Sequence, residues 1–124
     1  MEEPMYSVEA KVTENQLALS VADPIIDSEF SEIVGAVQRE ARKLKPGWTG
    51  AVDLRDMKVL KPENLKVMGE VQIALKRGGA GKIGTLLASA ILQGQLSRMA
   101  RQAQTEEQVR RFADEAEWRT FLKN

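Results

Sequence analysis

The spacing of apolar residues changes its period along this chain, and that change restricts the fold more than any other feature of the sequence. Every second residue from Tyr6 to Val12 is apolar, and the alternation resumes at Leu17 after a polar turn. A period of two is typical of strands that are buried on one face. The sequence therefore predicts a β-hairpin over residues 5–21.

The period becomes helical after Asp23-Pro24. The apolar residues then stand three or four positions apart, at Phe30, Ile33, Val34, Val37, Ala41 and Leu44. This spacing predicts a helix with one buried stripe. Asp27 or Ser28 is the expected N-cap, because its side-chain oxygen can accept a hydrogen bond from an unpaired backbone N–H. Pro46-Gly47 is expected to end the helix.

The rest of the chain alternates between predicted strands and predicted helices. The expected order is strand 48–54, a helix from Pro62 to Arg77, strand 82–88, helix 90–103, a short strand 109–112 and a helix capped by Asp114. This order, ββαβαβα(β)α, predicts an α/β fold with a mixed, partly parallel sheet and helices packed on it. Strands 48–54 and 82–88 are expected to be parallel neighbours joined by a right-handed crossover. We expect residues 1–124 to form a single domain.

Several side chains are expected in the hydrophobic core of this domain. The core prediction comprises Phe30, Val37, Val52 and Leu86, and both tryptophans, Trp48 and Trp118, are expected to pack structurally rather than stack on a ligand.

Composition excludes several classes of function. The chain has neither Cys nor His, which removes disulfides, Cys/His zinc sites, thiol nucleophiles and triads with an imidazole base. Eighteen basic and eighteen acidic residues give a formal net charge of zero, so nucleic acid is not an expected partner. The acidic start and the short apolar runs predict neither a secretory signal nor a membrane span, and we expect a cytoplasmic protein.

Two local patterns invite a chemical interpretation. The segment Gly78-Gly79-Ala80-Gly81-Lys82 resembles a phosphate-binding loop, but Lys76 and Ile83 stand where that motif needs Gly and Ser or Thr. A helix end followed by a tight turn is the preferred interpretation. Asp53, Asp56 and Glu63 surround the end of strand 48–54, and they leave open a hydrolase that uses a divalent metal. The preferred interpretation is a solvated loop in which Asp53 accepts hydrogen bonds from backbone amides.

The element order and the dipeptide Asp53-Leu54 resemble the STAS domain family, named for sulphate transporters and anti-sigma-factor antagonists. In that family, a strand ending in Asp-Leu leads to Asp-Ser-Ser-Gly at the start of a helix, and the first Ser is a phosphorylation switch. Here Lys61-Pro62-Glu63-Asn64 occupies the motif, and Leu65 matches the Leu that follows it. The resemblance implies the fold and a protein-binding role. Because Pro62 replaces the phosphoacceptor and has no hydroxyl, the switch is not carried over.

The sequence thus predicts a non-enzymatic interaction module of STAS-like type in a bacterial-type cytoplasm, without a cofactor or a metal. The expected partner-binding residues are Arg55, Asp56, Lys61, Glu63 and Asn64. The alternative is a domain that binds a small apolar or anionic ligand, held between a helix and the sheet or at the strand ends. The partner is unidentified, and homodimer formation stays open.

Overall fold

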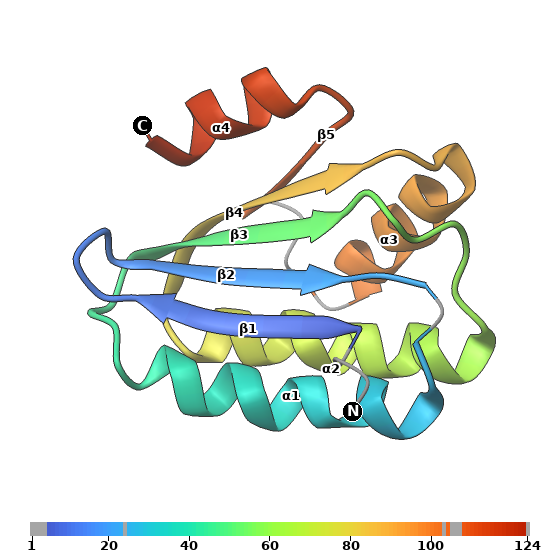
Figure 1. The fold of residues 1–124 in the computed structure, drawn as a ribbon, viewed down its shortest axis with the longest axis horizontal. Helices are drawn as coiled ribbons and strands as arrows, with labels where there is room; N and C mark the ends of the chain where they lie inside the picture. The colour runs from blue at the N-terminus through green and yellow to red at the C-terminus, as the bar shows by residue number, and fades with distance from the viewer. Residues whose placement is uncertain (1–4, 24, 103, 105–107, 124) are drawn as a thin grey trace.

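A computed structural model describes residues 5–23, 25–102, 104 and 108–123. Within these residues the chain forms five strands and four helices, in the order that the sequence predicts (Figure 1). The strands are β1 (Tyr6–Lys11), β2 (Gln16–Val21), β3 (Trp48–Leu54), β4 (Ala80–Leu87) and β5 (Val109–Phe112). The helices are α1 (Asp27–Ala41), α2 (Pro62–Arg77), α3 (Ala90–Gln102) and α4 (Glu115–Lys123).

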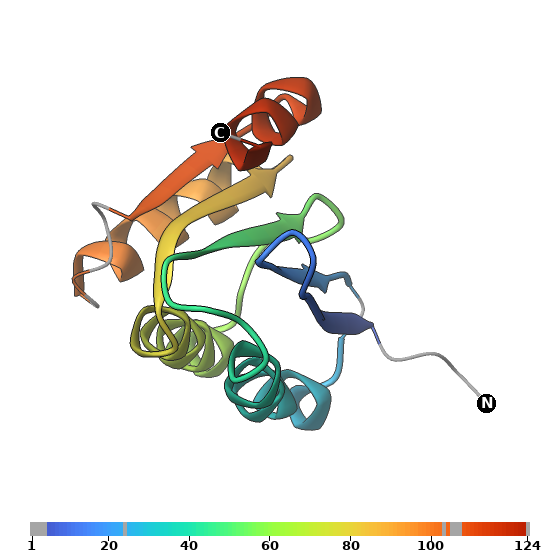
Figure 2. The same ribbon diagram turned by 90° about the vertical axis from the view of Figure 1, so that its left-hand side faces the viewer.

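All five strands belong to one sheet, in the spatial order β1-β2-β3-β4-β5. The hairpin pair β1 and β2 is antiparallel, and each later strand is parallel to its neighbour. Figure 2 shows the layers: α1, α2 and α3 cover one face, and α4 lies on the other. The mixed α/β sheet is therefore confirmed, including β3 and β4 as parallel neighbours.

The core has two parts, one on each face of the sheet. The larger part lies under α1, α2 and α3 and contains Phe30, Val37 and Val52, while Leu86 packs with Trp118 beneath α4. All four residues of the core prediction are buried. The tryptophans are buried as well, and their indole N–H groups are satisfied by backbone carbonyls: Trp48 Nε1 donates to Gly78 O at 2.9 Å, and Trp118 Nε1 donates to Gly84 O at 2.8 Å.

The start of α1 differs from the prediction. Ile26 is the N-cap, no side chain caps the helix, and Asp27 is already its first residue. The Asp27 carboxylate instead accepts a hydrogen bond from Asn64 Nδ2 at 3.3 Å, so a tertiary contact has replaced the local cap. The helix also ends at Ala41, before Leu44, which is partly buried against the core.

The other boundaries lie close to their predicted positions. Strand β4 begins at Ala80, two residues earlier than predicted, and α3 ends at Gln102, with residue 103 outside the described residues. The short strand β5 is confirmed. Asp114 caps α4 as predicted, because its Oδ1 accepts hydrogen bonds from the backbone N–H groups of Ala116 and Glu117 at 2.7 and 3.1 Å.

The glycine-rich segment of residues 78–82 contains the end of α2 and the turn into β4, which confirms the interpretation as a helix end followed by a tight turn. Gly78 caps α2 by donating its N–H to Ala74 O, and Gly79 has a φ of +107°, which disfavours any residue with a Cβ atom. Gly81 lies in β4 against the chain at Gly47, whose N–H donates to Gly79 O at 2.7 Å. These glycines allow two backbone segments to approach closely.

The edge strand β1 is covered by α1. Ala10 N donates to Glu40 Oε1 at 3.0 Å, and the Tyr6 hydroxyl donates to Glu32 Oε2 at 2.8 Å. The backbone N–H of Met5, just before the strand, donates to Glu29 Oε2 at 3.4 Å. The hydrogen bond with Glu32 raises the pKa of the Tyr6 phenol, because the carboxylate favours the protonated hydroxyl. Helix α1 thus supplies an acceptor to one backbone N–H of the β1 edge, that of Ala10, where a further strand would pair.

Candidate functional site

Three loops meet at the carboxyl end of the parallel strands. They follow β2, β3 and β4, and each leads into a helix, as the right-hand end of Figure 1 shows. In open α/β sheets, this end is where binding sites concentrate, because the loops converge there while the sheet holds them in place. The loop of residues 55–61 is the middle one and contains most of the predicted partner-binding residues.

Hydrogen bonds fix the 55–61 loop to its neighbours on both sides. Ser89 Oγ donates to Lys58 O at 2.6 Å, and Lys58 N donates to Asp23 Oδ2 at 3.2 Å. The Gln95 side chain pairs with the backbone of Leu60 through two bonds of 3.0 Å, one accepted and one donated. The loop is therefore held in one conformation by residues from the β2–α1 loop, the β4–α3 loop and α3.

Each of the three loops, or the first turn of the helix that follows it, presents one large apolar side chain to solvent. Ile26 is 60% exposed, Val59 is 54% exposed and Ile91, in the first turn of α3, is 68% exposed. We call these three residues the apolar trio. A single exposed apolar side chain is common on a protein surface. Three of them at the same end of the sheet, on segments joined by hydrogen bonds, mark that end as a candidate contact surface.

The loop that carries Val59 and the helix start that follows it also carry exposed charged side chains. Asp56, Lys58, Lys61 and Glu63 are all exposed, and both signs of charge are present. The Lys61 ammonium lies 3.9 Å from Asp27 Oδ1. An apolar centre with a charged, solvated rim is the usual arrangement of a protein-binding surface.

The five predicted partner-binding residues differ in exposure and in the direction of their side chains. Asp56, Lys61 and Glu63 are exposed, in the loop that carries Val59 and in the first turn of α2. Asn64 is buried, with 7% of its surface exposed, and its amide is bonded to Asp27, so it supports the surface from beneath. Arg55 reaches away to α4.

Arg55 joins the end of β3 to the start of α4. Its guanidinium bonds to both Asp53 oxygens, with Nη2 at 2.8 Å from Oδ2, and it forms a second ion pair with Glu115. The Glu115 carboxylate is shared with Arg119, which lies 2.6 Å away. The backbone N–H of Arg55 also donates to Asp53 Oδ1 at 3.1 Å, the amide contact expected from the sequence.

This network lowers the pKa of both carboxylates. Burial raises the pKa of Asp53, but hydrogen bonds from the side chain and backbone of Arg55 outweigh that effect and leave the pKa below its ordinary value. The Arg119 hydrogen bond is the main cause of the lowered Glu115 pKa, and Arg55 adds to it. Asp53 is therefore an ionised partner of Arg55 at neutral pH, and not a carboxyl group adapted to exchange protons there.

The lowered pKa values predict a loss of stability in acid. A carboxylate whose pKa is lower in the folded state than in the unfolded state stabilises the fold above about pH 4, and this contribution is lost as the pH falls through the folded-state pKa. The free energy of unfolding should therefore fall between about pH 5 and pH 2. Replacing Arg55→Met should make this fall smaller, as urea unfolding at each pH can measure. Arg98→Met, at an exposed position on α3, is the control, and an unchanged pH dependence in Arg55→Met would contradict the prediction.

The structure gives little support to the metal-dependent alternative. Within the described ranges, no three acidic side chains come together as a group that could hold a metal ion. Asp53 is engaged by Arg55, whereas Asp56 and Glu63 lie in the loop and in the first turn of α2. The three carboxylates proposed from the sequence therefore do not form one cluster.

The apolar trio was not predicted from the sequence. Each of its members is adjacent to a second apolar residue that is buried or partly buried: Ile25 beside Ile26, Leu60 beside Val59, and Leu92 beside Ile91. Two adjacent apolar residues at a loop end are the signal that could have predicted the trio. Neighbouring side chains there rarely point the same way, so when one is buried the other is exposed. The sequence does not show which member of each pair is outside.

Comparison with known proteins does not assign the chain to a family. No family model matches it, and neither a curated protein nor a solved structure matches it significantly. In the part of the chain that the structure describes, no helix is both long enough and apolar enough to span a membrane.

Proposed function

We propose that this chain is a non-enzymatic protein-interaction module of STAS-like type that binds a protein partner through the carboxyl end of its sheet. The observation that carries the proposal is the apolar trio, Ile26, Val59 and Ile91, on loops that are hydrogen-bonded to one another. A surface that is ordered before binding loses little conformational entropy when a partner covers it.

The start of α2 makes this surface independent of phosphorylation. Pro62 is the first residue of the helix, where its fixed φ suits the first turn and its missing N–H is not needed. It stands where the family that this chain resembles has its phosphoacceptor Ser, and a proline cannot accept a phosphate. Partner binding should therefore be the same before and after treatment with a phosphatase.

The experiment compares charge insertions at the two ends of the sheet. The double variant Val59→Asp with Ile91→Asp should lose a co-purifying protein partner more than tenfold, since each carboxylate would enter a desolvated interface. Val12→Asp is the matched control, because Val12 is 62% exposed but lies just after β1, in the hairpin turn at the opposite end of the sheet. All variants should keep the parent melting temperature within a few degrees, since the replaced side chains are exposed.

A charge reversal on the rim gives a second test. Lys61→Glu with Glu63→Arg should weaken the same partner less strongly, mainly by slowing association. Asn64→Arg is unsuitable for this purpose, because Asn64 is buried and the change would alter stability. A partner that binds all these variants equally would contradict the proposed surface. Retention of a small molecule in native mass spectra, with no protein partner, would favour the ligand-binding alternative.

A further inference from the structure

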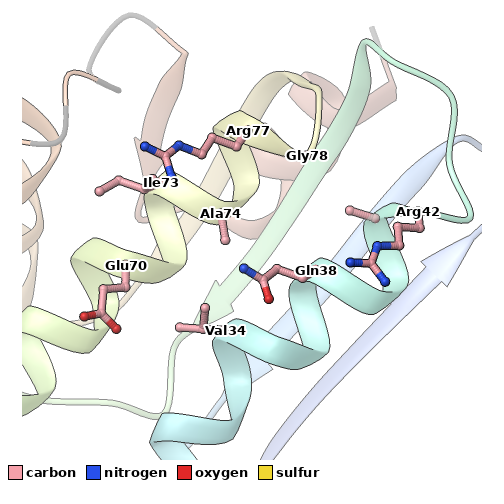
Figure 3. Close-up of a pocket in the computed structure, with 9 residues that line it drawn as sticks. Val34, Gln38, Arg42, Glu70, Ile73, Ala74, Arg77 and Gly78 are labelled. Carbon is pink, nitrogen blue, oxygen red and sulfur yellow. The ribbon is translucent and has the colours of Figure 1, made fainter.

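A groove of about 670 Å³ runs between α1 and α2. Figure 3 shows Val34 and Gln38 of α1, with Arg42 just after its end, along one side and Glu70, Ala74 and Arg77 of α2 along the other. The lining residues Ala41 and Ala74 are small and buried, whereas the longer polar side chains are exposed. The groove is therefore apolar at its floor and polar along its rim.

One large apolar side chain stands at the rim of the groove. Ile73 is 36% exposed and lies in the middle of α2, whereas the other exposed large apolar residues of the described chain lie in loops or at element ends. A helix centre that exposes an isoleucine beside an apolar floor offers a contact surface for another apolar segment.

The two ends of the groove carry opposite charge. Arg42 and Arg77 lie at the C-terminal ends of α1 and α2, while Glu70 lies two turns before Arg77, about 10.5 Å along the axis. Within the described residues, none of these three side chains has an ion pair or a side-chain hydrogen bond. The groove thus has two free guanidinium groups at one end and a free carboxylate at the other.

We propose that this groove binds one amphipathic helix of a protein partner, which runs antiparallel to α1 and α2. Both helices return from the carboxyl end of the sheet, so they run in the same direction and their C-terminal ends lie together. An antiparallel helix places its positive N-terminal end, with the acidic residues usual in a first turn, against Arg42 and Arg77. Its apolar face covers Ala74 and Ile73.

The position of Glu70 predicts where the partner helix carries a basic residue. Because the bound helix has the same rise per residue, a basic side chain about seven positions after its acidic first turn reaches Glu70. Apolar residues three and four positions apart lie between them and face the groove. The partner is therefore an acidic-then-apolar-then-basic helix, and the groove discriminates against the reverse order of charges.

This site is separate from the surface of the proposed function. The basic end of the groove lies at the C-terminal ends of α1 and α2, whereas the apolar trio lies at the opposite end of these helices (Figure 1). Substitutions in one site should therefore leave binding at the other unchanged, and separate variants test the two proposals.

The experiment uses a display library of randomised sixteen-residue amphipathic helices, selected against the full chain. Enriched peptides should carry acidic residues in the first turn and a basic residue two turns later. Their affinity should fall at least tenfold for Arg42→Glu with Arg77→Glu, but less than twofold for Arg98→Glu, an exposed arginine on α3. Far-UV circular dichroism and the melting temperature confirm that the variants are folded.

A charge exchange gives the decisive comparison. Replacing the acidic first-turn residues of an enriched peptide by lysine should abolish binding to the parent chain and restore it to Arg42→Glu with Arg77→Glu. Failure to enrich any peptide, equal binding to the parent and the double variant, or loss of binding on Val59→Asp with Ile91→Asp would each overturn the proposal.

Discussion

Replacing Val37→Asp should leave the chain largely unfolded. Val37 is completely buried in α1, within the larger part of the core. An aspartate there would place a carboxyl group among apolar side chains with no partner, at a cost above about 4 kcal/mol. Since domains of this size have a total stability of about 5–15 kcal/mol, such a cost removes most or all of it.

Thermal unfolding followed by circular dichroism measures this effect. The control is Gln38→Asp, one position further along α1, where the side chain is exposed and the change in charge carries no burial cost. The control should melt within a few degrees of the parent. A Val37→Asp protein that melts as high as Gln38→Asp would show that this face of α1 does not pack against the sheet.

Gly81→Ala should destabilise the chain although Gly81 is exposed. A Cβ atom at this position would lie 2.8 Å from Gly47 O, which is closer than real Cβ contacts come. The Gly47 backbone cannot move away easily, because its N–H is bonded to Gly79 O and its φ is +89°. We expect a loss of about 1–3 kcal/mol in the free energy of unfolding, as for other forced contacts.

Gly94→Ala is the matched control for that measurement. Gly94 is exposed in α3, and apart from its chain neighbours and the nearby backbone of its own helix no described atom lies within 4 Å of an added Cβ, so alanine should stabilise the helix by up to about 1 kcal/mol. Urea unfolding of the two variants should therefore give changes of opposite sign. Stabilisation by Gly81→Ala would show that the two backbone segments are not held together as the structure has them.

The order of elements could be predicted because each element carries its own period. The alternation in the hairpin and the stripe from Phe30 to Ala41 are local patterns, and their change of period marks the boundary between β2 and α1. The helix start was predicted wrongly because Asp27 has the right chemistry for a cap but is bonded to Asn64, which is distant in sequence. A local rule cannot anticipate a competing partner of that kind.

The candidate site was predictable in position but not in detail. The carboxyl end of the sheet follows from parallel strands, and Asp56, Lys61 and Glu63 lie there and are exposed. The direction of Arg55 depends on Glu115, which is brought close only by the packing of α4. The groove between α1 and α2 arises from the spacing of two helices, and no pattern within either helix specifies that spacing.

The cover over β1 limits how this sheet can grow. In an open-ended polymer held together by strand pairing, every copy needs two free sheet edges, because it must pair with one neighbouring copy on each side. Here α1 lies along one edge, and the Glu40 carboxylate occupies the outward N–H of Ala10. The other edge of the sheet is β5, which pairs with β4 on one side and has no strand on its other side among the described residues. We therefore expect two copies that pair edge to edge to do so through β5, and an assembly of that kind closes at two chains because it uses the same edge of each.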